Sequence, residues 1–98
     1  MPERIFTGVE LIAAERTRQI EVEGFTLEHD HQHDEGAIAA AAACYALYNW
    51  SRTDSVRLWP WDWECWKPSD DHIRNLVKAG ALIAAEIDRL QRYENENK

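Results

Sequence analysis

The sequence predicts an all-α fold, a bundle-like chain of three helices with a tryptophan-rich loop between the second and third. Three observations lead to this prediction. Apolar residues recur at intervals of three and four in three segments, the spacing of an amphipathic helix. Alanine, the best helix former, fills positions 39–43. No segment shows the period of two that is typical of a half-buried strand.

The first helix is expected at about 8–23. Thr7 and Glu10 have the spacing of a capping box, in which each side chain binds the backbone N–H of the other residue. Gly24 is suited to end the helix because glycine accepts the left-handed conformation. The helical stripe consists of Val9, Ile12, Ala13, Arg16 and Ile20.

The second helix is expected at about 34–50. Asp34 and Glu35 suit the positive end of its dipole. The small side chains of the alanine run allow another helix to approach closely. The segment 51–68 that follows is expected to be a loop, because it contains two prolines and begins with the polar residues SRTDS.

The third helix is expected at about 69–93, with Ser69 as its N-cap. Its apolar residues form a seam of coiled-coil type. They are Ile73, Leu76, Val77, Gly80, Ile83, Ala84, Ile87 and Leu90. Gly80 costs about 1 kcal/mol against alanine in a helix, so close contact with another backbone would explain it. Three helices of unequal length leave part of this seam uncovered, which predicts a homo-oligomer, most simply a two-fold dimer.

Composition narrows the functional classes. With 98 residues, the chain is expected to form a single domain over 1–98. Its net charge of −7 argues against nucleic-acid binding, which needs a basic surface. No apolar run approaches the roughly 20 residues that span a membrane, so we expect a cytoplasmic protein. Cys44 and Cys65 lie far apart, and we expect two reduced thiols, one of them in the core.

The segment EHDHQHD concentrates histidines and carboxylates. His29 and His33 are four residues apart, and so are Asp30 and Asp34. On a helix each pair would share a face, and imidazoles at this spacing can chelate zinc or a similar metal. In a loop the same residues could bind a divalent ion through carboxylates. The alternative is a solvated loop whose acidic residues cap the second helix.

The segment ERTRQI on the first helix offers a polar ligand-binding face. Glu15, Arg16 and Gln19 lie three or four residues apart. A forked guanidinium can hold phosphate or carboxylate through two hydrogen bonds. The alternative is a solvated face with internal ion pairs.

Four of the five tryptophans fall within positions 59–66. Indoles so concentrated either close the end of a small core or stack against a flat ligand such as a nucleobase. We expect Trp61 or Trp63 to take the binding role, because Pro60 and the charged residues Asp62 and Glu64 favour an exposed turn there.

Three motifs in this order resemble a group of small all-α proteins encoded by phages and prophages. They are ELIAAERTRQIEVEGFTLEHDHQHDEG, which the alanine run follows, then WPWDWECWKP and NLVKAGALIAAEIDRL. The resemblance extends over nearly the whole chain. The ERTRQ segment, the histidine-containing segment and the ALIAAEIDRL ending are more distantly similar to phage nucleotide pyrophosphohydrolases of the MazG type. That second resemblance implies a helical, oligomeric, magnesium-dependent enzyme that hydrolyses nucleoside triphosphates between the α and β phosphates.

The chain departs from the MazG metal motif, which is ExxE on one helix and ExxD on the next. No ExxE occurs in the sequence, and Glu86 and Asp88 are only two apart. Metal binding would need another geometry, with ligands drawn from Glu15, Glu28, Asp30 and Asp34.

We therefore expect a small phage-type binding protein rather than an enzyme. Its ligand would be nucleotide-like, or its partner a host factor, and it would act in the host cytoplasm, against host defences. The first alternative is a metal-dependent nucleoside triphosphate pyrophosphohydrolase. The second is a purely structural or interaction protein.

Overall fold

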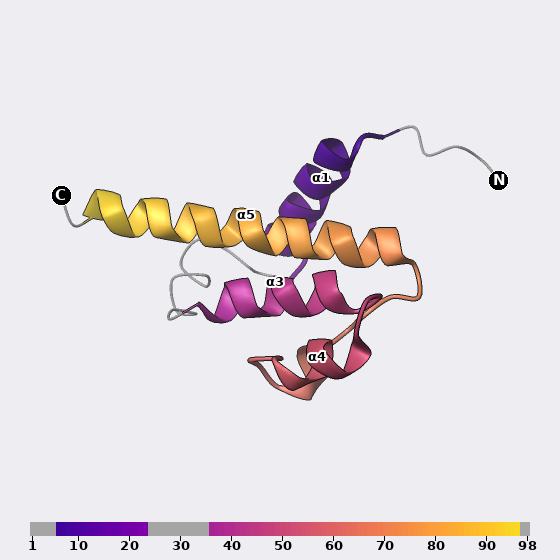
Figure 1. The fold of residues 1–98 in the computed structure, drawn as a ribbon. Coiled ribbons are helices and arrows are strands. Elements are labelled where there is room, and N and C mark those ends of the chain that lie inside the picture. Colours follow the sequence, from indigo (N-terminus) through magenta and orange to yellow (C-terminus); the bar gives the residue numbers. More distant parts are fainter. Residues whose placement is uncertain (1–5, 24–35, 97–98) are drawn as a thin grey trace.

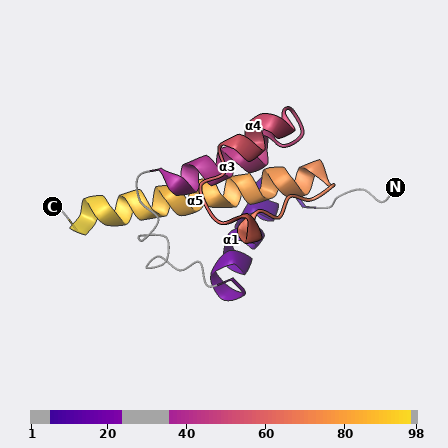
Figure 2. The same ribbon diagram turned by 90° about the horizontal axis from the view of Figure 1, so that it is seen from below.

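The computed structural model describes residues 6–23 and 36–96, and all regular structure in these ranges is helical, which confirms the predicted all-α class for them. The α-helices are α1 (Gly8–Glu21), α3 (Ala37–Leu47), α4 (Arg52–Arg57) and α5 (His72–Glu96). Helix α5 is the longest, and both α1 and α3 pack on it (Figure 1). Figure 2 shows α1 and α3 on different sides of α5. None of the described helices is long and apolar enough to cross a membrane.

The segment 51–68 contains more helix than the sequence indicated. Besides α4, it includes a 3₁₀ turn, η1 (Trp63–Cys65). The side chain of Ser51 starts α4 by accepting a hydrogen bond from the Asp54 N–H at 3.3 Å. The predicted loop is therefore a folded segment that packs back onto α3.

Helix α1 begins with the predicted capping box. The Thr7 hydroxyl accepts from the Glu10 N–H at 3.2 Å, and the Glu10 carboxylate accepts from the Thr7 N–H at 2.9 Å. The helix ends at Glu21, two residues before the expected end. Gly24 lies outside the described residues.

Helix α3 forms the centre of the core. It starts after Gly36, whose φ of 85° is left-handed and therefore suits glycine, and it ends at Leu47 rather than at 50. The expected first turn at 34–35 lies outside the described residues. Cys44 is fully buried, as one of the two thiols was predicted to be. The buried core cluster consists of Ile38, Ala41, Ala42, Cys44, Tyr45, Trp59, Ala79, Leu82 and Ala85.

Helix α5 begins at His72, three residues later than the sequence indicated, and Ser69 is not its cap. Asp71 takes that place, since its carboxylate accepts from the Ile73 N–H at 3.0 Å. Ser69 is instead held by the buried Asn75 side chain, which accepts from the Ser69 N–H at 2.7 Å and donates to its carbonyl at 2.8 Å. This pairing fixes the entry of the chain into α5.

Gly80 marks the crossing of α1 and α5. A Cβ atom at Gly80 would lie 2.5 Å from Cδ1 and 2.8 Å from Cγ1 of Ile12. The glycine therefore makes room for a side chain of α1 in the same protein, and the expectation that it meets another backbone was wrong.

Candidate functional site

A pocket of about 790 Å³ opens between α1, α3, α5 and the segment after α4. This volume lies within the range of pockets that hold small molecules. The polar part of its lining includes Glu15, Arg18, Gln19, Glu23 and Lys78, and the aromatic part includes Tyr45, Trp59 and Trp61.

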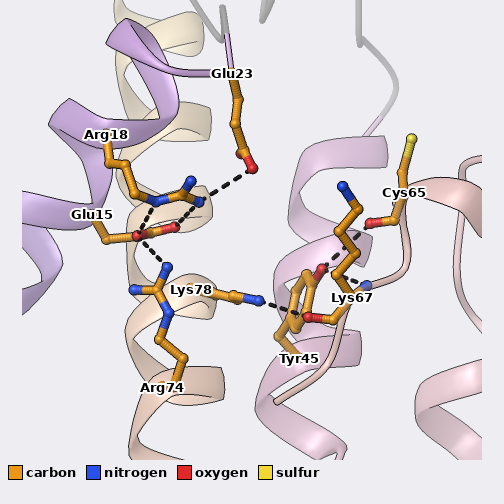
Figure 3. A network of polar contacts seen from close by, with 8 residues as sticks. All are labelled: Glu15, Arg18, Glu23, Tyr45, Cys65, Lys67, Arg74 and Lys78. Carbon is orange, nitrogen blue, oxygen red and sulfur yellow. Dashed lines mark hydrogen bonds and ion pairs between the residues drawn. The ribbon is translucent and has the colours of Figure 1, made fainter.

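Glu15 is the centre of the polar network on the α1 side (Figure 3). Its side chain is 1% exposed, and its two oxygens accept from Arg18 Nε and Nη2 at 2.8 and 2.9 Å. Arg74 Nη2 of α5 lies 2.7 Å from Glu15 Oε1. Burial alone would raise the pKa of Glu15, but the hydrogen bonds from Arg18 and Arg74 outweigh it and lower the pKa. Both oxygens are thus occupied, and the ion pairs join α1 to α5.

Arg18 also reaches past the end of α1, with Nη2 3.2 Å from the Glu23 carboxylate. The two carboxylates hold the guanidinium in one orientation, and its side chain remains 36% exposed at the pocket. Arg18 is therefore a positioned cation whose charge is largely neutralised by its own neighbours.

Lys78 extends from α5 toward the opposite wall of the pocket (Figure 3). Its ammonium donates to the Lys67 carbonyl at 2.6 Å and lies 5.4 Å from the centre of the Tyr45 ring. Burial lowers the pKa of Lys78, and the nearby Arg74 guanidinium lowers it further. No carboxylate among the described residues forms an ion pair with it, although the charges of Glu15 and Glu23 act on its pKa in the opposite direction to Arg74.

Tyr45 joins α3 to the loop wall of the pocket. Its hydroxyl accepts from the Lys67 N–H at 3.2 Å and donates to the Cys65 carbonyl at 3.5 Å. Burial raises the pKa of the phenol. The hydroxyl therefore stays neutral and fixes the backbone on which Lys67 and its carbonyl lie.

The tryptophan segment packs against Tyr45 rather than projecting as a separate platform. Trp59 is 9% exposed and meets Tyr45 edge to face, with ring centres 5.7 Å apart. The ring centres of Trp66 and Trp59 are 4.7 Å apart. Trp61 meets Trp59 edge to face, with ring centres 5.4 Å apart. Trp59 thus belongs to the core, and the partly buried Trp61 and Trp66 pack against it. Trp61 also lines the pocket.

Gln19 is the polar residue of this pocket that the described structure leaves least satisfied. Its side chain belongs to α1, and the residue is only 3% exposed. Its amide oxygen has no hydrogen-bond partner among the described residues. A buried acceptor without a partner costs about 1–3 kcal/mol, which a ligand N–H or O–H in the pocket would recover.

The structure brings together three of the five residues proposed from the sequence as ligand-binding, namely Glu15, Gln19 and Trp61. Arg16 lies away from this pocket, buried against α5 with Nε 3.8 Å from Asp88 Oδ2. Trp63 is 59% exposed and is not part of the lining. On the helix, Arg16 follows Glu15 by about 100° and so points to another side of α1.

The proposed metal ligands lie outside the described residues. They are His29, Asp30, His33 and Asp34. Within residues 6–23 and 36–96, no group of three or more histidine, cysteine, aspartate or glutamate side chains could hold a metal ion.

Sequence reasoning missed Arg18, Tyr45, Arg74 and Lys78. Arg18 lies three residues after Glu15, so its ion pair could have been read from helix spacing. Lys78 gave a weaker signal, as a lone cation in the apolar run 76–84, one turn before the buried Leu82. Nothing in the sequence indicated that Arg74 would reach α1.

The chain matches no family model, no curated protein and no solved structure. Inference about function therefore rests on the chemistry of the pocket.

Proposed function

We propose that this protein binds a small nucleotide-like ligand, with a flat ring and an anionic group, in the pocket between α1 and the tryptophan segment. One observation carries the proposal. The same aromatic pocket is lined by Lys78 and by the buried amide oxygen of Gln19. Among the described residues, the lysine has no ion-paired carboxylate and the amide oxygen has no hydrogen-bond donor.

The anionic group is assigned to Lys78. Its ammonium has three donors, and the described contacts use one of them, on the Lys67 carbonyl. Burial strengthens its interaction with an anion because the local dielectric constant is low. Glu23, Asp62 and Glu64 also line the pocket, so they repel an anion from the rest of the wall. This distribution of charge would orient the ligand.

The flat ring is assigned to the wall formed by Trp61 and Trp59. Stacking on an aromatic side chain contributes about 1–3 kcal/mol per base and tolerates any base, because every base has a π-face. The amide oxygen of Gln19 would accept a hydrogen bond from a ring or amino N–H. An amino-bearing purine or cytosine ring meets both requirements.

Binding without hydrolysis fits the state of Glu15. The carboxylate that could have served as a metal ligand is bound by Arg18 and Arg74. The competing hypothesis is a MazG-type enzyme, which would convert the bound nucleoside triphosphate into a detectable hydrolysis product.

The test is a panel of nucleoside triphosphates and cyclic nucleotides with and without Mg²⁺. Melting temperature and tryptophan emission report binding, and chromatography of the mixture reports cleavage. We expect at least one nucleotide to raise the melting temperature and change the emission, and no product to form. Product formation would establish the enzymatic alternative, and a panel without any response would refute the proposal.

Lys78→Met removes the proposed anion contact, and we expect it to weaken binding by at least tenfold. The matched control is Arg57→Met on α4, which removes a cation whose side chain is 67% exposed and is not part of the pocket lining. If Lys78→Met and Arg57→Met weaken ligand binding equally, the ligand responds only to the net charge of the protein, and the assignment of the anion site to Lys78 is wrong.

A further inference from the structure

The charged residues that line the pocket include more carboxylates than cations. Among the described residues, the carboxylates of the lining are Glu15, Glu23, Asp62 and Glu64. The cations of the described lining are Arg18, Lys67 and Lys78. Residues 24–35, which follow Glu23 in the chain, contain no lysine or arginine that could be added to them. These few cations therefore limit the negative charge that a ligand can bring into the pocket.

Arg18 is a cation whose charge is already compensated within the protein (Figure 3). Its guanidinium lies 2.8 Å from a Glu15 oxygen and 3.2 Å from a Glu23 oxygen. Glu15 is shared with Arg74 of α5, at 2.7 Å. The two arginines and the two carboxylates together form a network without net charge. A phosphate group would have to displace a carboxylate in order to bind Arg18.

Lys67 and Lys78 are the other two cations, and they differ in exposure. Lys67 is exposed, so water and salt screen its charge. Lys78 is partly buried, and its ammonium is held 2.6 Å from the Lys67 carbonyl oxygen. A buried cation attracts an anion more strongly because the local dielectric constant is low. Lys78 therefore provides one strong position for one negative charge.

Asp62 and Glu64 bring negative charge to the aromatic wall. Asp62 follows Trp61 directly, and its carbonyl accepts a hydrogen bond from Trp59 Nε1 at 3.1 Å. None of the ion pairs between described residues involves Asp62 or Glu64. The described part of the chain also contains no carboxylate cluster that could hold a metal ion and link it to a phosphate. The two side chains therefore act on a phosphate in the pocket by repulsion.

We propose that the ligand of this pocket carries a single negative charge, as the phosphodiester of a cyclic nucleotide does, and is not a nucleoside diphosphate or triphosphate. This assignment rests on the proposed function and specifies the class of nucleotide. Lys78 pairs with the one charge of the diester, while the ring stacks on the tryptophan wall. The additional charges of a diphosphate or triphosphate would find only the exposed Lys67, and they would face Asp62 and Glu64.

The test is a series of ligands that share one base and differ in charge, titrated into the full chain by calorimetry. The base is the one that binds most tightly in the nucleotide panel. The series consists of the nucleoside, its 3′,5′-cyclic monophosphate, and its 5′-monophosphate, diphosphate and triphosphate, first in EDTA and then with Mg²⁺. Under both conditions we expect the cyclic nucleotide to bind at least about tenfold more tightly than the triphosphate, because juxtaposed like charges oppose binding. It should also bind more tightly than the uncharged nucleoside, which cannot pair with Lys78.

A double variant tests the repulsion directly. Asp62→Asn combined with Glu64→Gln should narrow the preference for the cyclic nucleotide by at least about threefold, since both charges lie at the pocket, within roughly a Debye length of a bound phosphate. The matched control combines Asp54→Asn with Glu94→Gln. It removes the same number of charges at positions that are not part of the lining, and it should leave the preference unchanged.

The possible outcomes separate this assignment from the proposed function. A triphosphate that binds as tightly as the cyclic nucleotide, with or without Mg²⁺, would overturn the assignment and leave nucleotide binding itself intact. Equal narrowing in the two double variants, or none in either, would show that the pocket carboxylates do not select the ligand. A series in which no member binds would refute the proposed function and this assignment with it.

Discussion

Replacing Glu15 by glutamine tests whether its ion pairs hold α1 on α5. Glu15→Gln preserves the shape of the side chain but removes the charge that Arg18 and Arg74 share. Breaking a buried ion pair costs about 3–5 kcal/mol, and an exposed one contributes about 0.2–1 kcal/mol. Glu15 is buried, whereas both arginine side chains are 36% exposed and can return to water. We therefore expect a loss of about 2 kcal/mol in the free energy of unfolding.

Urea denaturation followed by circular dichroism at pH 7 measures this loss directly. For a chain of this size, about 2 kcal/mol corresponds to a fall in melting temperature of about 8–16 °C. The control is Asp54→Asn, which removes an exposed ion pair of 3.4 Å with Arg57 and should cost less than about 0.5 kcal/mol. A Glu15→Gln variant as stable as this control would refute the role assigned to the network.

The same variant has a defined pH dependence. The pKa of Glu15 in the folded protein is lowered from the ordinary value of 4.5. Its contribution is therefore fully present above the unfolded pKa and is lost as the pH falls through the lowered folded value. The stability difference between wild type and Glu15→Gln should shrink below about pH 4.5. A difference that is constant down to pH 2.5 would show that the charge of Glu15 does not contribute.

Four further outcomes follow from the described contacts. Trp59→Ala should cost about 3–5 kcal/mol as a core deletion, whereas Trp61→Ala should cost less and weaken ligand binding; urea titrations and emission titrations separate the two effects. Gly80→Leu should overpack Ile12 and cost about 1–3 kcal/mol, and an unchanged melting temperature would contradict the close approach. Anion binding should weaken as the pH rises toward the lowered pKa of Lys78, below the 10.5 of an ordinary lysine, in a titration that Lys78→Met makes flat. If the His29–Asp34 segment binds metal, a chelator should lower the melting temperature of the wild type but not of His33→Ala, and elemental analysis should find the metal.

Helix starts were predictable where the determining contact is local. The capping box of α1 needs only Thr7 and Glu10, three residues apart, and both hydrogen bonds are present. The start of α5 was misplaced because Ser69 and Asp71 are both good caps by residue type. Asn75, six residues after Ser69, binds Ser69 and leaves the cap to Asp71. That contact depends on a side chain returning across a turn, which residue preferences do not describe.

The polar site shows the same division. Helical spacing in ERTRQI correctly placed Glu15 and Gln19 on one side of α1. It wrongly grouped Arg16 with them, since Arg16 points toward Asp88. It also did not show that Arg18 lines the pocket. The direction of each side chain depends on where α1 crosses α5, and Ile12 meets Gly80 at that crossing.

By itself, the sequence determined the all-α class and the main helical segments of the described chain, because helix formation follows from hydrogen bonds and side-chain spacing within a few residues. Only the tertiary structure decided which faces of those helices meet. It packed Tyr45 and Trp59 together across 14 residues, brought Arg74 to Glu15 across 59, and turned part of the α5 seam outward. These contacts depend on how whole helices pack to bury apolar surface, a balance to which distant residues contribute at once.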